Sequence, residues 1–128
     1  AELADVRTAG FVTLINNRPD GEEAGQPEAV AIRAAAEAAG LGYHEIPVGQ
    51  GGIGHYDLDA MAAALEAGPA LAFCRSGTRS CNLWALARAK GGDDPAELIA
   101  KAAGAGYDLR GLAPTLNALS GAALAGRA

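Results

Sequence analysis

The stretch Ala-Leu-Ala-Phe-Cys-Arg-Ser-Gly-Thr-Arg-Ser, residues 70–80, contains the pattern that decides the fold. Its first four residues are wholly apolar and follow the turn signal Gly68-Pro69, so they predict a short buried strand. A polar loop with one glycine comes next, and Cys81 to Lys90 predicts a helix that Gly91-Gly92 ends. The sequence therefore predicts a strand, a tight loop and a helix in direct succession.

The same alternation of strands and helices runs through the rest of the chain. Two more strands are predicted, Phe11 to Ile15 and Leu41 to Val48. Helices are predicted over residues 1–9, 27–39, 57–67 and about 94–103, and from about residue 112 onward. Apolar strands separated by helices favour a parallel sheet covered on both faces. We therefore predict an α/β fold, three-layered with a mostly parallel sheet, in a single domain over residues 1–128.

Composition and charge exclude several classes of function. The net charge of −5 leaves no basic surface for nucleic acid, and no apolar run approaches the ~18 residues of a membrane span. We therefore expect a cytoplasmic protein without nucleic-acid or membrane partners. Two cysteines cannot form a disulfide framework, and no His or Cys has metal-ligand spacing, so neither a metal nor another cofactor is expected.

Three polar loops are predicted to meet at one edge of the sheet. Parallel strands deliver their following loops to the same edge, which places together Asn16 to Gln26, Val48 to His55 and Cys74 to Ser80. Asn17 and Arg18 then come within reach of Cys74. In the alternative interpretation the polar side chains build the turn itself, and Arg18 pairs with an acidic residue of its own loop, Asp20 or Glu22.

Cys74 lies between the predicted strand and the first turn of a helix. Unpaired amides at a helix N-terminus carry partial positive charge and lower the pKa of a thiol there. Gly77 allows the backbone to curl so that successive amides, those of Ser76, Gly77 and Thr78, point toward the sulfur or an anion attached to it. The structural alternative is a cysteine that merely fills the core.

Three polar side chains of the loop complete this candidate site. Arg79 can clamp an anion through its planar guanidinium group, and Arg75 can steer anions toward the loop. Ser80 is predicted either to hydrogen-bond the thiolate or to cap the helix. Cys81 is interpreted as a core thiol or as a partner that resolves a Cys74 persulfide, and Tyr107 as a half-buried residue with its hydroxyl in water.

These motifs resemble those of a known family. The loop is similar to the loops of cysteine-dependent phosphatases and rhodanese sulfurtransferases, and the whole chain resembles the phosphatase-like domain of beta-lactamase-hydrolase-like proteins. The resemblance rests on Ile15 to Glu23, Gln26-Pro27, Ile46 to Val48, Cys74 to Ser80 with Asn82 to Ala85, and Ala105 to Leu109. It implies a dual-specificity-phosphatase-like fold, assignment to sulfur transfer and, in some members, an attached persulfide dioxygenase. Members also have a strand and turn ahead of the position where this chain begins, so that N-terminal strand is expected to be missing here.

The length of the loop separates phosphate chemistry from sulfur chemistry. Four residues lie between Cys74 and Arg79, whereas the phosphatase signature has five and the short form resembles rhodaneses. A phosphatase also needs an acid for the leaving alkoxide, yet after Val48 the chain has Gly49, Gln50 and more glycines, with no carboxylate before Asp57. The acidic residues of the first loop, Asp20, Glu22 and Glu23, are interpreted mainly as solvated or helix-capping charges.

We therefore predict a sulfurtransferase as the leading function. Cys74 would take sulfane sulfur from a small anionic donor, such as thiosulfate or a persulfide, and pass it to a thiol acceptor. A phosphatase acting through a phosphocysteine is the alternative, and a non-catalytic module that binds anions or senses persulfides is a third possibility. A persulfide dioxygenase is the protein partner that the resemblance implies.

Overall fold

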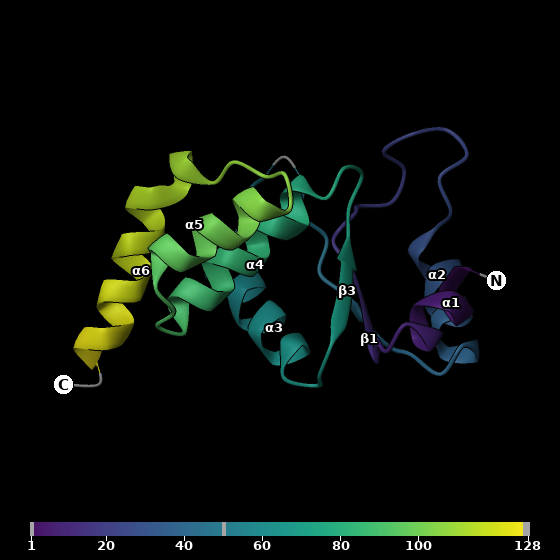
Figure 1. Ribbon diagram of the computed structural model, residues 1–128. Helices are drawn as coiled ribbons and strands as arrows, with labels where there is room; N and C mark the ends of the chain where they lie inside the picture. Colours follow the sequence, from purple (N-terminus) through teal and green to yellow (C-terminus); the bar gives the residue numbers. More distant parts are fainter. Residues whose placement is uncertain (1, 50, 127–128) are drawn as a thin grey trace.

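The computed structural model describes residues 2–49 and 51–126, and it has three layers (Figure 1). The middle layer is a parallel sheet of β1 (Thr13–Asn16), β2 (Gly42–Glu45) and β3 (Ala70–Phe73), in the order β2-β1-β3. On one face lie α1 (Glu2–Thr8) and α2 (Ala29–Ala38). The opposite side holds α3 (His55–Leu65), α4 (Thr78–Lys90), α5 (Pro95–Gly104), the 3₁₀ turn η1 (Arg110–Leu112) and α6 (Ala113–Gly126). The predicted three-layered α/β fold with a parallel sheet is confirmed.

Strand β1 is the centre of the sheet and the most buried of the three strands. Its Thr13 is in register with Gly42 of β2 and with Ala70 of β3, and all four of its residues are buried. Burial on both faces explains why apolar and polar residues do not alternate along this strand. The regular strand begins at Thr13, two residues after the predicted start, although Val12 still donates a backbone hydrogen bond to Pro69 over 2.9 Å.

Strand β2 differs from the sequence prediction. The expected buried run from Leu41 to Val48 pairs only over Gly42–Glu45, and three of those four residues are exposed. Leu41, Ile46 and Val48, which flank the strand, are the buried positions. The reason is that β2 pairs with β1 alone within the described sheet, so its own residues lie at an edge and the apolar flanks enter the core.

The main hydrophobic core fills the space between the sheet and the helices α3 to α6. Its largest fully buried side chains include Ile15, Met61, Leu83, Leu98 and Leu116. Helix α4 runs through the middle of this layer and also buries three alanines, whose small side chains let α3 and α6 pack closely against it. The helix that follows Cys74 is therefore held from several sides.

Helix α4 begins at Thr78, three residues earlier than predicted. Gly77 stands directly before it with φ +89°, a left-handed conformation that favours glycine, and this residue turns the loop into the helix. Thr78, Arg79 and Ser80 thus form the first turn of α4. Within the described ranges, no helix has the length and apolar character needed to cross a membrane.

Candidate functional site

The three loops predicted to meet at the carboxyl edge of the sheet are in contact. Arg79, on the first turn of α4, donates one hydrogen bond to the backbone oxygen of Val48 over 2.7 Å. Its two terminal nitrogens also bind the two oxygens of the Glu22 carboxylate at 2.7 and 2.8 Å. One guanidinium group therefore joins all three loops, and the predicted convergence is confirmed.

The sulfur of Cys74 is surrounded by donors from its own loop. The amide of Gly77 donates to Cys74 Sγ over 3.1 Å. Partial burial raises the pKa of the Cys74 thiol, but the amide and the hydroxyl of Ser80 and the amides of Ser76 and Gly77 outweigh it, so the pKa is lowered overall. This is the arrangement expected of a reactive cysteine at a helix N-terminus, because the donors stabilise the thiolate.

Ser80 contributes to this environment rather than to a helix cap. Its hydroxyl oxygen is buried and has no hydrogen-bond partner by distance and angle among the described residues, but its amide and hydroxyl lower the pKa of Cys74. The N-cap of α4 is Gly77, which has no side chain to make a cap. Of the two roles predicted for Ser80, the lowered pKa of Cys74 favours the one beside the sulfur.

A network of opposite charges surrounds Arg79. Arg18 donates to Glu22 over 3.1 Å and to Glu23 over 3.0 Å, and Arg75 lies 3.7 Å from Glu23. The hydrogen bond from Arg79 has the largest effect on the pKa of Glu22, and together with the bond from Arg18 it lowers that pKa to about 2, although burial opposes them. Glu22 is therefore ionised at any physiological pH, and it fixes the orientation of Arg79.

The sequence interpretation did not predict the ion pair between Glu22 and Arg79. That interpretation placed Glu22 among solvated or capping charges, although it did allow Glu22 as a partner of Arg18, which the structure shows. Gln26 gives the loop its shape, because its side chain accepts from the amide of Glu22 over 3.1 Å and donates to the carbonyl of Pro19 over 2.8 Å. The loop thus delivers Glu22 to a residue that lies far away along the chain.

The remaining predicted site residues occupy two kinds of position. Asn17 is fully buried, donates its side-chain amide to the carbonyl of Ile46 over 2.9 Å and its backbone amide to that of Phe73 over 2.8 Å. It thereby ties together the ends of the three strands. The Arg75 side chain is exposed, and the hydroxyls of Ser76 and Thr78 bond each other over 3.2 Å. That these residues contact the substrate remains a prediction.

The carboxylates near the site that could serve as a general acid already have other partners. Asp20 accepts from the amide of Ala29 over 2.7 Å at the start of α2, and Asp57 accepts from the amide of Gly54 over 2.9 Å at the start of α3. Gln50 lies outside the described residues. No group of three His, Cys, Asp or Glu side chains within residues 2–49 and 51–126 is arranged to hold a metal.

The two cysteines differ in their surroundings. Both are free and half-buried. Burial raises the pKa of Cys81, whereas that of Cys74 is lowered by its loop. Cys81 packs against the main core, which agrees with the interpretation of a core thiol.

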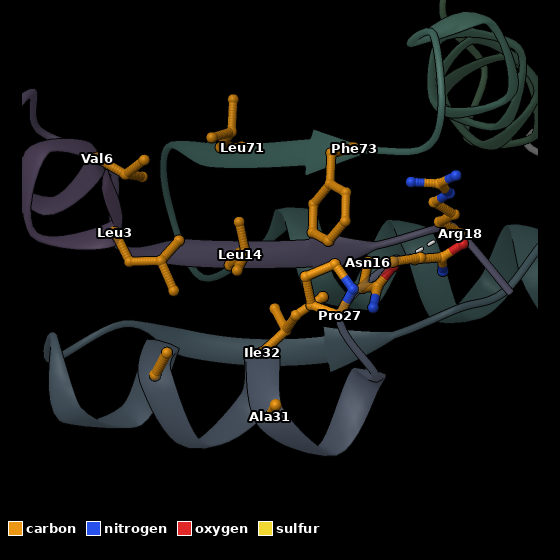
Figure 2. Close-up of a pocket in the computed structure, with 12 residues that line it drawn as sticks. Leu3, Val6, Leu14, Asn16, Arg18, Pro27, Ala31, Ile32, Leu71 and Phe73 are labelled. Atoms are coloured by element: carbon orange, nitrogen blue, oxygen red, sulfur yellow. Dashed lines mark hydrogen bonds between the residues drawn. The ribbon is translucent and has the colours of Figure 1, made fainter. Parts of the chain in front are cut away.

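A separate cavity lies on the other face of β1, between the sheet and the helices α1 and α2 (Figure 2). Its volume is about 490 Å³, and Leu14, Leu71 and Phe73 are among the residues that line it. Phe73, the residue directly before Cys74, therefore faces away from the α4 layer. The polar groups at one end, Asn16 and Arg18, are already hydrogen-bonded within the protein, so this cavity is apolar in character.

Comparisons with known proteins agree with this geometry. Residues 1–91 match the family model of the phosphatase-like domain of beta-lactamase hydrolase-like protein. Relatives named beta-lactamase hydrolase-like protein are 42% identical over 94 residues in Agrobacterium fabrum and 42% identical over 87 residues in Xylella fastidiosa. These matches cover 72% and 66% of this chain but only 22% and 20% of the relatives, so the chain spans about a fifth of their length.

Solved structures show the same fold. A crystal structure from Neisseria meningitidis, named a "putative phosphatase", has a TM-score of 0.72 and 35% identity, and the match covers 92% of this chain and 83% of that one. A structure from Shewanella putrefaciens with the same printed description has a TM-score of 0.66 at 22% identity, covering 98% and 78% of the two chains, and it supports the fold alone. The chain belongs to the family of phosphatase-like domains found in beta-lactamase hydrolase-like proteins.

Proposed function

We propose that this domain is a thiol enzyme that transfers sulfane sulfur, with Cys74 as its nucleophile. The observation that carries the proposal is the combination of a thiolate-stabilising loop with carboxylates that, among the described residues near this loop, are already bound to other groups and are not free to protonate a leaving group. The short spacing between Cys74 and Arg79 supports the same assignment. The matched family model is described as phosphatase-like, and the similar structure from Neisseria meningitidis is named a "putative phosphatase", so phosphate-ester hydrolysis is the second candidate.

The absence of a free acid matters because the two reactions differ in their leaving groups. In phosphate-ester cleavage the thiolate attacks phosphorus and an alkoxide leaves, which requires a proton. Glu22 has a pKa of about 2 and is held by two arginines, so it carries no proton to give. In sulfur transfer from thiosulfate, the thiolate attacks the outer sulfur and sulfite leaves as a stable dianion that needs no proton.

The proposed reaction has two steps. The Cys74 thiolate forms a bond to the outer sulfur of thiosulfate while the bond from that sulfur to the sulfonate group breaks, giving a Cys74 persulfide anion and sulfite. A thiolate acceptor then attacks the same outer sulfur, forms its own persulfide and restores the Cys74 thiolate. The bonds of Arg79 to Glu22 and Val48 use three of the five N–H groups of a guanidinium, so two N–H groups can still donate to the anion.

The description of the family and the printed name of the Neisseria meningitidis structure favour the phosphatase alternative. This alternative also explains a cysteine and an arginine on one anion-binding loop. In that reaction Cys74 would carry a phosphoryl group, which water then removes. The lack of a free acid implies slow turnover of alkyl phosphates and faster turnover of aryl phosphates, whose leaving groups are stable without a proton.

Mass spectrometry distinguishes these reactions directly. After incubation with thiosulfate, the intact protein should gain ~32 Da at Cys74, the mass of one sulfur atom, and lose it on addition of a thiol. The gain should disappear in Cys74→Ser and persist in Cys81→Ser, the matched control. Release of phosphate from an aryl phosphate that depends on Cys74, without any gain of sulfur, would establish the phosphatase alternative instead. If neither activity is detected, a non-catalytic module that binds anions is the remaining interpretation.

The partners of the domain follow from the same proposal. The substrates would be a small anionic sulfur donor and a thiol acceptor, and a persulfide dioxygenase is the proposed protein partner because it would consume the persulfide that forms. The much greater length of the curated relatives leaves room for such a partner in the same chain.

A further inference from the structure

Tyr107 lies outside the segment matched by the family model, yet it is fixed against the cysteine loop. It follows the end of α5, where Gly106 adopts φ +92° and the amide of Tyr107 donates to the carbonyl of Ala102 over 2.9 Å. Its ring packs against the main core, and Leu109, two residues later, is buried. The ring therefore has a defined place rather than the freedom of a surface tyrosine.

The hydroxyl of Tyr107 holds one end of a single peptide unit. It donates to the carbonyl oxygen of Ser76 over 3.0 Å. The other end of that peptide unit is the amide of Gly77, which donates to Cys74 Sγ over 3.1 Å. In a planar trans peptide the C=O and the N–H point in opposite directions, so a bond that fixes the oxygen also fixes the direction of the amide.

Gly77 explains both why the Ser76–Gly77 peptide needs a restraint and why the Tyr107 side chain has room to pack against it. Its positive φ is freely available to glycine, and glycine also has access to other conformations, so the peptide can rotate unless something restrains it. A rotated peptide would turn the carbonyl oxygen of Ser76 toward the sulfur, and its partial negative charge would destabilise a thiolate. The missing side chain leaves room for the tyrosine, since a Cβ on Gly77 would collide with the Tyr107 hydroxyl and lie 3.0 Å from Cζ.

We propose that Tyr107 is a positioning residue that holds the Ser76–Gly77 peptide with its amide directed at Cys74. Through this contact, a residue that does not touch the sulfur stabilises the thiolate. The inference rests on Cys74 reacting as a thiolate, as in the proposed function, but it does not depend on whether the substrate carries sulfur or phosphate.

The test is the pH dependence of Cys74 alkylation by iodoacetamide, followed by mass spectrometry in wild type and Tyr107→Phe. This variant keeps the ring and removes only the hydroxyl, a loss too small to unfold a domain. We expect the midpoint for Cys74 to move to higher pH by up to about one unit, so that alkylation below the midpoint slows by about three- to tenfold. Tyr56→Phe, at a residue that is 83% exposed, is the matched control and should leave the midpoint unchanged.

A second measurement separates positioning from general loosening. In wild type the amide resonance of Gly77 should shift with the same midpoint as Cys74 ionisation, and in Tyr107→Phe this shift should weaken. Cys81, alkylated in the same sample, reports any general loosening of α4. An unchanged Cys74 midpoint in Tyr107→Phe overturns the proposal, as does a shifted Cys74 midpoint that is accompanied by faster alkylation of Cys81. Because no substrate is used, failure of this test leaves the proposed function standing.

Discussion

Replacing Gly77 by alanine tests how the loop, the helix and Tyr107 fit together. Two costs add at this position. An alanine at φ +89° costs about 1–2 kcal/mol in the left-handed region. The new Cβ would also collide with the Tyr107 hydroxyl, and overpacking of this kind costs about 1–3 kcal/mol. The expected loss in the free energy of unfolding is therefore about 2–5 kcal/mol.

A second glycine separates the two costs. Gly25 has φ +81°, and a Cβ there meets nothing within 4 Å, so Gly25→Ala carries the conformational cost alone, about 1–2 kcal/mol. Adding Tyr107→Phe to Gly77→Ala removes the nearest colliding atom, so the double variant should recover about 0.5–3 kcal/mol relative to additivity. Urea unfolding of the four proteins and wild type measures all of these values.

The result that would refute the reasoning is also clear. If Gly77→Ala costs no more than Gly25→Ala and shows no coupling to Tyr107, then the close packing of Tyr107 on the loop does not exist in solution. Alkylation of Cys74 provides an independent check, because a displaced Gly77 amide should slow the reaction near neutral pH even where the variant is folded.

Three further predictions concern the thiols, the charge network and a helix cap. Alkylation of wild type should give Cys74 a midpoint below that of an ordinary thiol and Cys81 one above it, because loop donors lower the first pKa and burial raises the second; coincident midpoints would contradict the site. Glu22→Gln should reduce kcat/KM for the sulfur donor by about tenfold or more and should also lower stability, because Arg79 loses its paired carboxylate, and Glu22→Asp should fall between. The pKa of Glu22 is lowered to about 2, so its pairing with Arg79 should persist from neutral pH downward and fail only as the pH approaches 2. A pH profile of kcat/KM should therefore show no acidic limb caused by Glu22. Asp94→Ala should lower stability by about 1 kcal/mol in thermal unfolding without affecting Cys74, because Asp94 accepts from the amide of Ala96 at the start of α5; an unchanged melting temperature would argue against that cap.

Local sequence patterns predicted much of this fold because its elements are set by local chemistry. The strand at residues 70–73 lies where its apolar run places it, and the helix from Pro95 follows from Asp94 and the proline itself. The start of α4 was misplaced because Thr78 and Ser80 are weak helix formers. Gly77 was expected to curl the loop, but no local pattern shows that the helix begins directly after it. The extent of β2 depended on its place at an edge of the sheet, which only the tertiary fold decides.

The sequence likewise predicted the part of the candidate site that lies within one loop, but not the residues that are distant along the chain. Cys74, Gly77 and Arg79 could be proposed as candidates from the sequence because they lie within one short loop whose spacing carries chemical meaning. Glu22 is 57 residues from Arg79, and Tyr107 is 31 residues from Ser76, so no spacing in the sequence connects them. The sequence indicates a solvated side chain for a glutamate in an acidic loop, because it does not show that a distant arginine binds the carboxylate. Contacts of this kind arise from the folding of the sheet, not from the pattern of any one segment.

The salt-bridge network around the loop has a consequence for how substrates arrive. Arg18, Arg75 and Arg79 face Glu22 and Glu23, and an ionised Cys74 brings the formal charges of this group into balance. A locally neutral cluster in an acidic protein exerts little long-range attraction on anions. Binding must then depend on short-range hydrogen bonds, so encounter rates should vary only weakly with ionic strength.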